Sequence, residues 1–218
     1  MATGDNNIVS TEKLQTAINE IKRWTVKWRI KLNETKSVHV DFTNKRIDHK
    51  PVYINNQIVP YENSAKYLGM TLDAKLRWKP HVKKKQEELK MKYRKMYWLL
   101  GRHSALSVHN KLLLYRQVLK PIWTYGIQLW GCTSQSNRMI IQRFQNKVLR
   151  AIVNAPWYIR NDNLHKDLDV EIVDNVIKLY AQRHEQRLQQ HVNIEAHQLL
   201  DNDDLIRRLK RVKPFELV

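Results

Sequence analysis

The pattern of apolar and polar positions changes near residue 75 of the chain. Before that point, a stretch with helical spacing at residues 14–28 is followed by short runs in which apolar and polar residues alternate, which is the period of a β-strand. After it, apolar residues recur every three or four positions, which is the period of an amphipathic helix. The sequence therefore predicts an α+β fold, in which a helix and a small sheet precede a nearly all-helical remainder.

In the first part, the pattern predicts one helix and several strands. Thr11 is a suitable N-cap for the helix, because its hydroxyl can accept a bond from a free backbone N–H of the first turn. The alternating run 38–42 predicts a strand. Asn55-Asn56 lies between two short apolar runs, and two turn-forming residues in that position predict a tight hairpin.

The alternating stretch 66–72 predicts a further strand, with Gly69 in its interior. Glycine weakens a strand and usually marks a bulge, a bend or the close approach of another backbone. Gly69 is therefore interpreted either as a bend or as the place where a ligand strand passes the sheet.

The second part predicts a series of helices. Pro80 suits the first turn of a helix that Gly101 ends. Ser107 is a suitable N-cap for the next helix, which Pro121 is expected to kink or break. Further helices are predicted to begin near Ser136, Ile172 and Leu205.

The composition indicates a polyanionic partner. The 218 residues include 39 Lys and Arg against 21 Asp and Glu, a formal net charge of +18, so nucleic acid is favoured over a membrane surface. We find no apolar run long enough to span a bilayer and no signal peptide. Cys132 is the single cysteine, which excludes an internal disulfide and a zinc site needing two thiolates. The expected compartment is intracellular and reducing, nuclear or cytoplasmic.

The basic residues are concentrated in one segment. Residues 75–102 contain eleven Lys and Arg against two Glu, whereas residues 162–204 contain ten acidic against four basic residues. An alternative interpretation of the basic segment is a solvent-exposed helix face with ion pairs such as Lys84–Glu88. Because basic residues outnumber acidic ones so heavily, phosphate contact is favoured. The predicted nucleic-acid-binding residues are Lys79, Lys83, Lys84, Lys85, Lys90 and Arg94.

A search for catalytic and metal-binding patterns gives no site. His184 and His191 are seven residues apart and would need two further ligands to hold zinc. Asp203-Asp204 is the only candidate for the adjacent carboxylates that two-metal catalysis needs, and its polar surroundings indicate a loop and a helix cap. We therefore assign no catalytic residue and no metal ligand.

Four stretches of the sequence together match one known family. They are Trp24 with Trp28 to Asn33; Lys66 to Gly69 with Trp78 and His81; Pro121 with Gly126, Trp130, Gly131, Gln142, Gln145 and Arg150; and Ala155 to Tyr158. In this order and spacing they resemble the reverse transcriptase of non-LTR retrotransposons, in particular the jockey-like mobile elements of insects. The resemblance covers essentially the whole chain.

The resemblance implies a partial polymerase palm sheet with a primer-grip-like hairpin, followed by a mostly α-helical thumb and C-terminal region. Residues 1–74 would form the palm remnant, residues 75–135 the basic thumb-like helices and residues 136–218 the helical C-terminal region. The primer-grip-like residues would be Lys66, Tyr67, Leu68 and Gly69. Valine at position 69 is expected to impair primer contact more than folding, because valine suits a strand.

The resemblance also implies partners and a cofactor. The partners would be an RNA template, a DNA primer and the missing upstream part of the polymerase, with no membrane. The full-length family enzyme uses Mg²⁺, which its paired catalytic aspartates hold. That aspartate pair is absent from this sequence, so the chain is expected to bind no cofactor and to be inactive alone.

The function hypothesis is a C-terminal fragment of a retrotransposon RNA-directed DNA polymerase, which contacts primer and template without polymerising alone. The alternative is a non-enzymatic nucleic-acid-binding or assembly module derived from a retrotransposon. A pseudogene product without a role is a third hypothesis.

Overall fold

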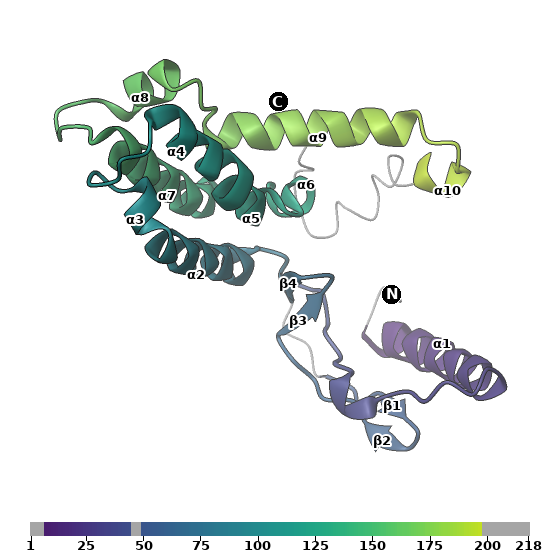
Figure 1. Ribbon diagram of the computed structural model, residues 1–218. Coiled ribbons are helices and arrows are strands. Elements are labelled where there is room, and N and C mark those ends of the chain that lie inside the picture. The colour runs from purple at the N-terminus through teal and green to yellow at the C-terminus, as the bar shows by residue number, and fades with distance from the viewer. Residues whose placement is uncertain (1–6, 45–48, 198–218) are drawn as a thin grey trace. The chain divides into compact units, whose positions relative to one another are not determined.

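The computed structural model describes residues 7–44 and 49–197 of the chain (Figure 1). The chain divides into two compact units, Met1–Leu76 and Arg77–Val218. The described residues are mostly helical and contain two small antiparallel hairpins, which is compatible with the predicted α+β class. The assignment of palm and thumb stays a prediction.

The first unit contains a long helix and two hairpins. Its elements are α1 (Asn7–Lys27), the 3₁₀ helix η1 (Glu34–Lys36), β1 (Tyr53–Ile54), β2 (Gln57–Ile58), β3 (Ser64–Tyr67) and β4 (Met70–Asp73). Strand β1 pairs with β2, and β3 pairs with β4. The amide of Gln15 joins α1 to β1, because it exchanges hydrogen bonds of 3.0 and 2.9 Å with the backbone of Tyr53.

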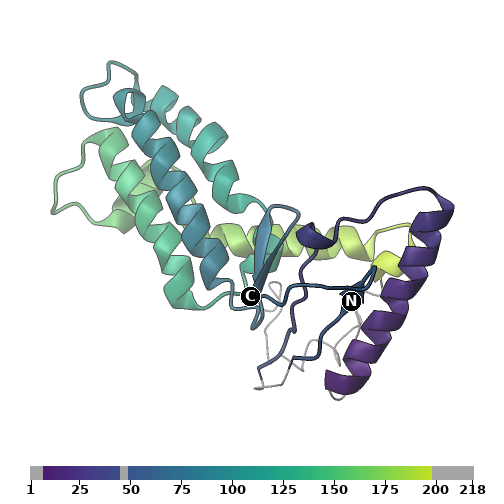
Figure 2. The same ribbon diagram turned by 90° about the horizontal axis from the view of Figure 1, so that it is seen from below.

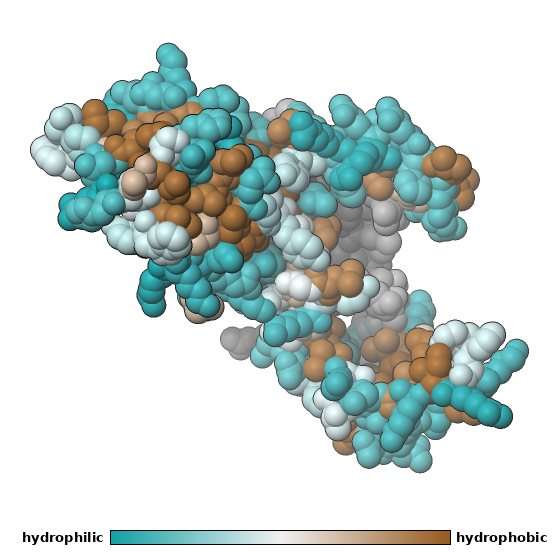
Figure 3. All heavy atoms as spheres, viewed as in Figure 1, coloured by the Kyte–Doolittle hydropathy of each residue, from teal (hydrophilic) through white to brown (hydrophobic). Residues whose placement is uncertain are grey.

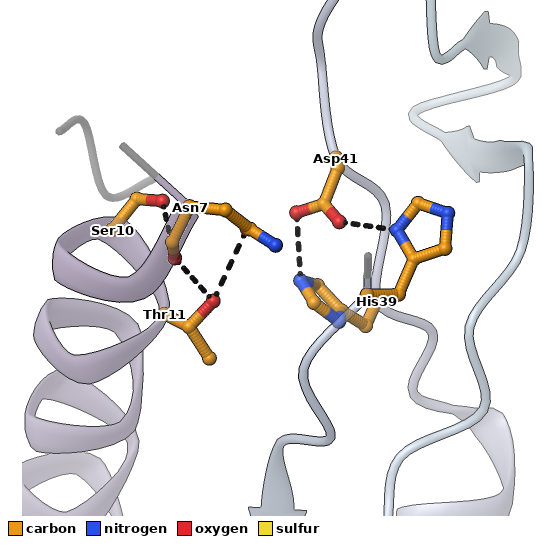
Figure 4. Close-up of polar contacts among 6 residues, drawn as sticks. Asn7, Ser10, Thr11, His39 and Asp41 are labelled. Atoms are coloured by element: carbon orange, nitrogen blue, oxygen red, sulfur yellow. Dashed lines mark hydrogen bonds and ion pairs between the residues drawn. The ribbon is translucent and has the colours of Figure 1, made fainter. Parts of the chain in front are cut away.

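Helix α1 begins at Asn7, five residues before the start that Thr11 as N-cap predicts. Thr11 does not cap it, because its hydroxyl donates to the carbonyl of Asn7 at 2.8 Å (Figure 4). The hydroxyl of Ser10 donates to the same carbonyl at 3.0 Å. A threonine hydroxyl can bond backwards inside a helix as well as cap one, and the sequence does not distinguish the two cases.

The predicted strand 38–42 is wrong. Only His39 forms a β-bridge, to Tyr61, and its N–H and C=O pair with the backbones of Pro60 and Glu62. The neighbouring Asp41 instead lies between two histidine rings, 3.2 Å from Nε2 of His39 and 2.8 Å from Nδ1 of His49 (Figure 4).

The predicted hairpin at Asn55-Asn56 is confirmed. Both residues have positive φ, 49° and 64°, as the tight turn between β1 and β2 requires. The predicted single strand 66–72 is wrong, since the chain reverses at Leu68-Gly69 and forms the β3–β4 hairpin. A two-residue turn keeps the alternation of side chains on both sides, so the strand period alone does not reveal it.

The end of α1 and the residue that follows it, Trp28, expose large apolar side chains. Trp24, Val26 and Trp28 are 54%, 69% and 62% exposed, and Figure 3 shows apolar atoms at the surface of both units. The buried apolar residues among the described residues of this unit are Val52, Val59 and Met70. The unit therefore has a small core, and a small core contributes little stability.

The second unit is helical. Its elements are α2 (Lys79–Lys95), α3 (Tyr97–Leu100), α4 (Val108–Leu114), the π-helical segment η2 (Tyr115–Leu119), α5 (Lys120–Thr124), α6 (Ile127–Trp130), α7 (Gln135–Val153), α8 (Asn161–Asp167), α9 (Val173–Gln189) and α10 (Ile194–His197). Helices α2 and α7 lie side by side (Figures 1 and 2). The helix predicted near Leu205 lies outside the described residues.

Most helix ends agree with the sequence signals. Pro80 lies in the first turn of α2, and the hydroxyl of Ser107 accepts a hydrogen bond from Asn110 N–H at the start of α4. Helix α7 begins at Gln135, one residue before the predicted start. Pro121 does not break its helix, because α4, η2 and α5 follow one another without a gap. The wide π-helical turn before the proline accommodates its ring and its missing N–H.

Large aromatic residues and a polar network fill the core of this unit. Trp123, Trp130 and Tyr115 are each 1% exposed. The side chain of Gln145, in α7, donates to the hydroxyl of Tyr115 at 3.0 Å and to the carbonyl of Glu171 at 2.9 Å. Burial raises the pKa of Tyr115 to about 12, so this hydroxyl stays neutral.

Candidate nucleic-acid interface

The basic residues of α2 do not share one face. Lys79, Lys83, Lys90 and Arg94 are exposed and follow one another at intervals of four, seven and four residues. At about 100° per residue, such intervals keep all four within roughly 60° of one another, over about 22 Å along the axis. We call these four residues the α2 stripe.

Two of the predicted binding residues lie outside the α2 stripe. Lys84 is half-buried, and it lies roughly 100° away from the stripe on the helical wheel. Only 12% of the Lys85 side chain is exposed, and its Nζ is 2.9 Å from Glu88 Oε2 and 5.7 Å from the ring centre of Tyr125. Lys85 is therefore held by contacts within the protein. The alternative interpretation of the basic segment expected an ion pair between Lys84 and Glu88. In the structure, Glu88 pairs with Lys85 instead.

A side of α2 about 90° around the helix from the α2 stripe is fixed in the core. Val82, Leu89 and Tyr93 are buried, and the ring of Tyr93 meets that of Phe144 in α7 edge to face at 6.0 Å. The backbone before α2 is also held, because Thr133 Oγ1 donates to the carbonyl of Arg77 at 2.8 Å. The α2 stripe is thus mounted on a rigid element rather than on a loop.

His81 lies in this core and takes no part in the stripe. It is fully buried, with its ring 6.0 Å from that of Trp78 and 6.4 Å from that of Trp130. Burial, together with the nearby positive charge of Lys85, lowers the pKa of His81 to about 4, and the negative charge of Glu88 offsets this only in part. The imidazole is therefore neutral at physiological pH.

In the first unit, the four primer-grip-like residues lie at the tip of the β3–β4 hairpin. Lys66, Tyr67 and Leu68 are exposed, and Tyr67 pairs with Met70 at the last rung before the turn. Leu68 and Gly69 have φ values of 46° and 74°. A leucine at positive φ costs about 1–2 kcal/mol, and such strain often occurs at functional positions.

The conformation of Gly69 corrects the expectation for Gly69→Val. A valine is strongly disfavoured at φ 74°, so the variant is expected to destabilise the hairpin by about 2 kcal/mol or more. Gly69→Asn should cost less than half as much, because asparagine tolerates this region. The measurement is amide hydrogen exchange over residues 64–73. If both variants exchange like the parent, the turn does not depend on glycine.

The described residues hold no catalytic metal site. In residues 7–44 and 49–197, no three His, Cys, Asp or Glu side chains are arranged to bind a metal ion. The same residues contain no helix that is long and apolar enough to cross a membrane. The described part therefore offers no site that fits the Mg²⁺ implied by the resemblance, and we derive no chemical step through a metal.

Comparison with curated proteins gives relatives over nearly the whole chain. The probable RNA-directed DNA polymerase from transposon X-element of Drosophila melanogaster is 40% identical over 96% of this chain. That from transposon BS of the same species is 36% identical over 91%. The RNA-directed DNA polymerase from mobile element jockey of Drosophila funebris is 32% identical over 97%.

The chain is a relative of the non-LTR transposon RNA-directed DNA polymerases. The resemblance to the jockey-like elements is thereby confirmed. The chain spans 23%, 22% and 24% of the length of the three relatives named above. No protein-family profile matches the chain, and no solved structure matches it.

The residues that carry the resemblance to these transposon polymerases are largely structural in the second unit. A Cβ on Gly131 would lie 2.7 Å from Ile177 Cγ2, so this glycine lets α6 approach α9 closely. Gln142 links α7 to α8 and α9, since its amide bonds His165 Nε2 at 3.1 Å and the backbone N–H of Val173 at 2.7 Å. The resemblance identified these positions, and the structure supplies a packing reason for each.

Proposed function

We propose that the chain forms a primer–template-contacting part of a non-LTR retrotransposon RNA-directed DNA polymerase. The α2 stripe follows the phosphate backbone of the RNA–DNA duplex as a thumb-like helix. The tip of the β3–β4 hairpin contacts the primer. The observation that carries the proposal is the alignment of four exposed cations on one face of α2, while an adjacent face, about 90° around the helix, is fixed in the core.

The physics of phosphate contact supports this role. Basic residues that neutralise phosphates release counterions, which gives affinity that depends strongly on salt and little on sequence. The spacing of the α2 stripe suits a contact along one groove edge, and its rigid support limits the entropy lost on binding. At the hairpin tip, the exposed Tyr67 and the strained turn at Leu68 support a contact surface.

The exposed tryptophans at the end of α1 and just after it support an association with the upstream part of the polymerase. Trp24 and Trp28 lie with ring centres 6.3 Å apart, and more than half of each side chain is exposed. Covering them would add apolar burial to a unit whose own core is small.

The test is a salt titration of binding between the full chain and an RNA–DNA hybrid of mixed sequence. We expect the logarithm of the affinity to fall linearly with the logarithm of the salt concentration, and hybrids of unrelated sequence to bind alike. Weak binding without salt dependence would contradict the proposed function.

A second candidate is the non-enzymatic nucleic-acid-binding or assembly module. It is favoured by the absence of a carboxylate cluster in the part of the chain that the structure describes. Both candidates use the same α2 stripe, so hybrid binding alone does not separate them.

The isolated chain is expected to extend no primer with Mg²⁺ or Mn²⁺, because two-metal catalysis needs carboxylates held close together. The measurement is incorporation of labelled nucleotides on a primed RNA template. A polymerase preparation that extends the same template serves as the positive control. Template-dependent incorporation by the pure chain would contradict both candidates as stated.

A further inference from the structure

The loop between α7 and α8 presents two adjacent aromatic side chains to solvent. Trp157 is 90% exposed, the largest fraction among the described aromatic residues, and Tyr158 is 65% exposed. Their ring centres are 6.0 Å apart, and the ring planes meet at 81°. Exposing two large rings side by side on a loop forgoes the burial that such side chains normally contribute.

The loop is held in place by Arg150 near the end of α7. The guanidinium donates to the carbonyl of Ile159 at 2.8 Å, to Asn161 Oδ1 at 3.1 Å and also to the carbonyl of Pro156. These bonds close the loop on both sides of the aromatic pair. The pair is therefore presented by an ordered turn, as a preformed binding surface requires.

The surroundings of the pair are positively charged. Residues 143–166 contain five basic residues and one acidic residue, a net charge of +4, and the acid, Asp162, lies 3.6 Å from Arg160. Arg143 and Lys147 are exposed on α7, four residues apart, which places them about 6 Å apart along the axis. At about 100° per residue, Arg143 and Lys147 lie on the same side of α7 as Arg150, which holds the loop. Aromatic rings combined with a row of cations are typical of surfaces that bind single-stranded nucleic acid.

We infer that Trp157 and Tyr158 stack with unpaired bases of a nucleic-acid strand whose phosphates run along Arg143 and Lys147. The inference rests on the proposed function in that the partner is nucleic acid. It differs in the binding surface, which is not the α2 stripe, and in the ligand, which is a single strand and not a duplex.

The test compares strands that differ only in their bases. The full chain is titrated with single-stranded RNA and DNA of about twelve nucleotides and with an abasic DNA strand of equal length. Stacking of one or two bases should make the base-bearing strands bind about tenfold tighter or more. Trp157→Ala with Tyr158→Ala should remove this preference and leave the salt dependence unchanged. Trp157→Phe with Tyr158→Phe should retain most of it.

The matched control is Trp24→Ala with Trp28→Ala, which removes another exposed aromatic pair from the first unit. It should leave the preference for base-bearing strands intact. Equal binding of base-bearing and abasic strands by the parent chain, or an unchanged preference in the Trp157–Tyr158 alanine variant, would overturn the inference. RNA bound more tightly than DNA, with both lowered in that variant, would support it and indicate an RNA strand.

Binding to the RNA–DNA hybrid separates this inference from the proposed function. The Trp157–Tyr158 alanine variant should bind the hybrid like the parent chain, because the duplex contact lies on the α2 stripe. Normal hybrid binding without a base preference removes the inference alone. If the parent chain does not bind the hybrid, the proposed function is contradicted, and the single-strand experiment still tests the inference independently.

Discussion

Replacement of the four α2-stripe residues by glutamine is expected to lower the salt slope of hybrid binding by about three units. Each neutralised phosphate contributes about 0.9 to this slope on B-form DNA and somewhat less on other strands. Because the four exposed cations share one face, they can contact the same duplex together. At salt near 0.15 M the affinity should fall by roughly two orders of magnitude.

The matched control removes four exposed charges from the first unit. Lys13, Arg23, Lys27 and Lys31 lie on or just after α1, and their replacement by glutamine changes the net charge equally. We expect this variant to lose less than one unit of slope. The measurement is binding of an RNA–DNA hybrid between 50 and 300 mM salt. Equal slopes for both variants would mean that net charge, and not the α2 stripe, governs binding.

Acid is expected to destabilise the helical unit through His81. The pKa of this buried histidine is about 4 in the folded chain and about 6.5 when it is unfolded, so the unfolded state binds the proton more readily. The contribution of the neutral imidazole is therefore complete above pH 6.5 and is lost as the pH falls towards 4. The expected loss between pH 7.5 and pH 4.5 is roughly 2–3 kcal/mol.

His81→Leu should remove this pH dependence. The variant is expected to start from a different stability at pH 7.5, since the packing against Trp78 and Trp130 changes, and to lose about 2 kcal/mol less than the parent on acidification. The measurement is urea unfolding at both pH values, followed by tryptophan fluorescence. Parallel pH profiles for parent and variant would show that other groups cause the acid effect.

Local signals in the sequence predicted much of the fold. Asn55-Asn56 predicted a turn because both residues tolerate positive φ. Ser107 predicted a helix N-cap because its hydroxyl can accept a hydrogen bond from a free backbone N–H of the first turn. The alternation of side chains did not predict the turn at Leu68-Gly69, because leucine is an unusual residue at positive φ and the alternation continues across the turn. The resemblance to the retrotransposon polymerases did imply a hairpin at these residues. Tertiary contacts decide such positions, and a single sequence does not display them.

In the candidate interface, too, some features can be predicted from the sequence and others depend on tertiary contacts. The intervals between Lys79, Lys83 and Lys90 can be found from the sequence by helical geometry alone. The low exposure of Lys85 could not be predicted from the sequence, because it depends on a contact with Tyr125, forty residues later in the chain. The exposure of Trp157 could not be predicted either, since tryptophan is usually highly buried and the hydrogen bonds that Arg150 donates to the loop are not evident from the sequence.

The π-helical segment before Pro121 determines which way the side chains after it face around the helix axis. Every fourth residue from 111 to 127 is buried: Lys111, Tyr115, Leu119, Trp123 and Ile127. In an uninterrupted α-helix, steps of four residues drift by about 40° each, so a stripe of this length would turn away from the core. A π turn contains one residue more than an α turn and resets the rotation. That extra residue keeps Trp123 in line with Tyr115, eight residues earlier. A one-residue deletion within 115–119 would place them seven residues apart, about two turns of regular α-helix, so we expect it to convert the π turn into α-helix and leave Trp123 facing the core.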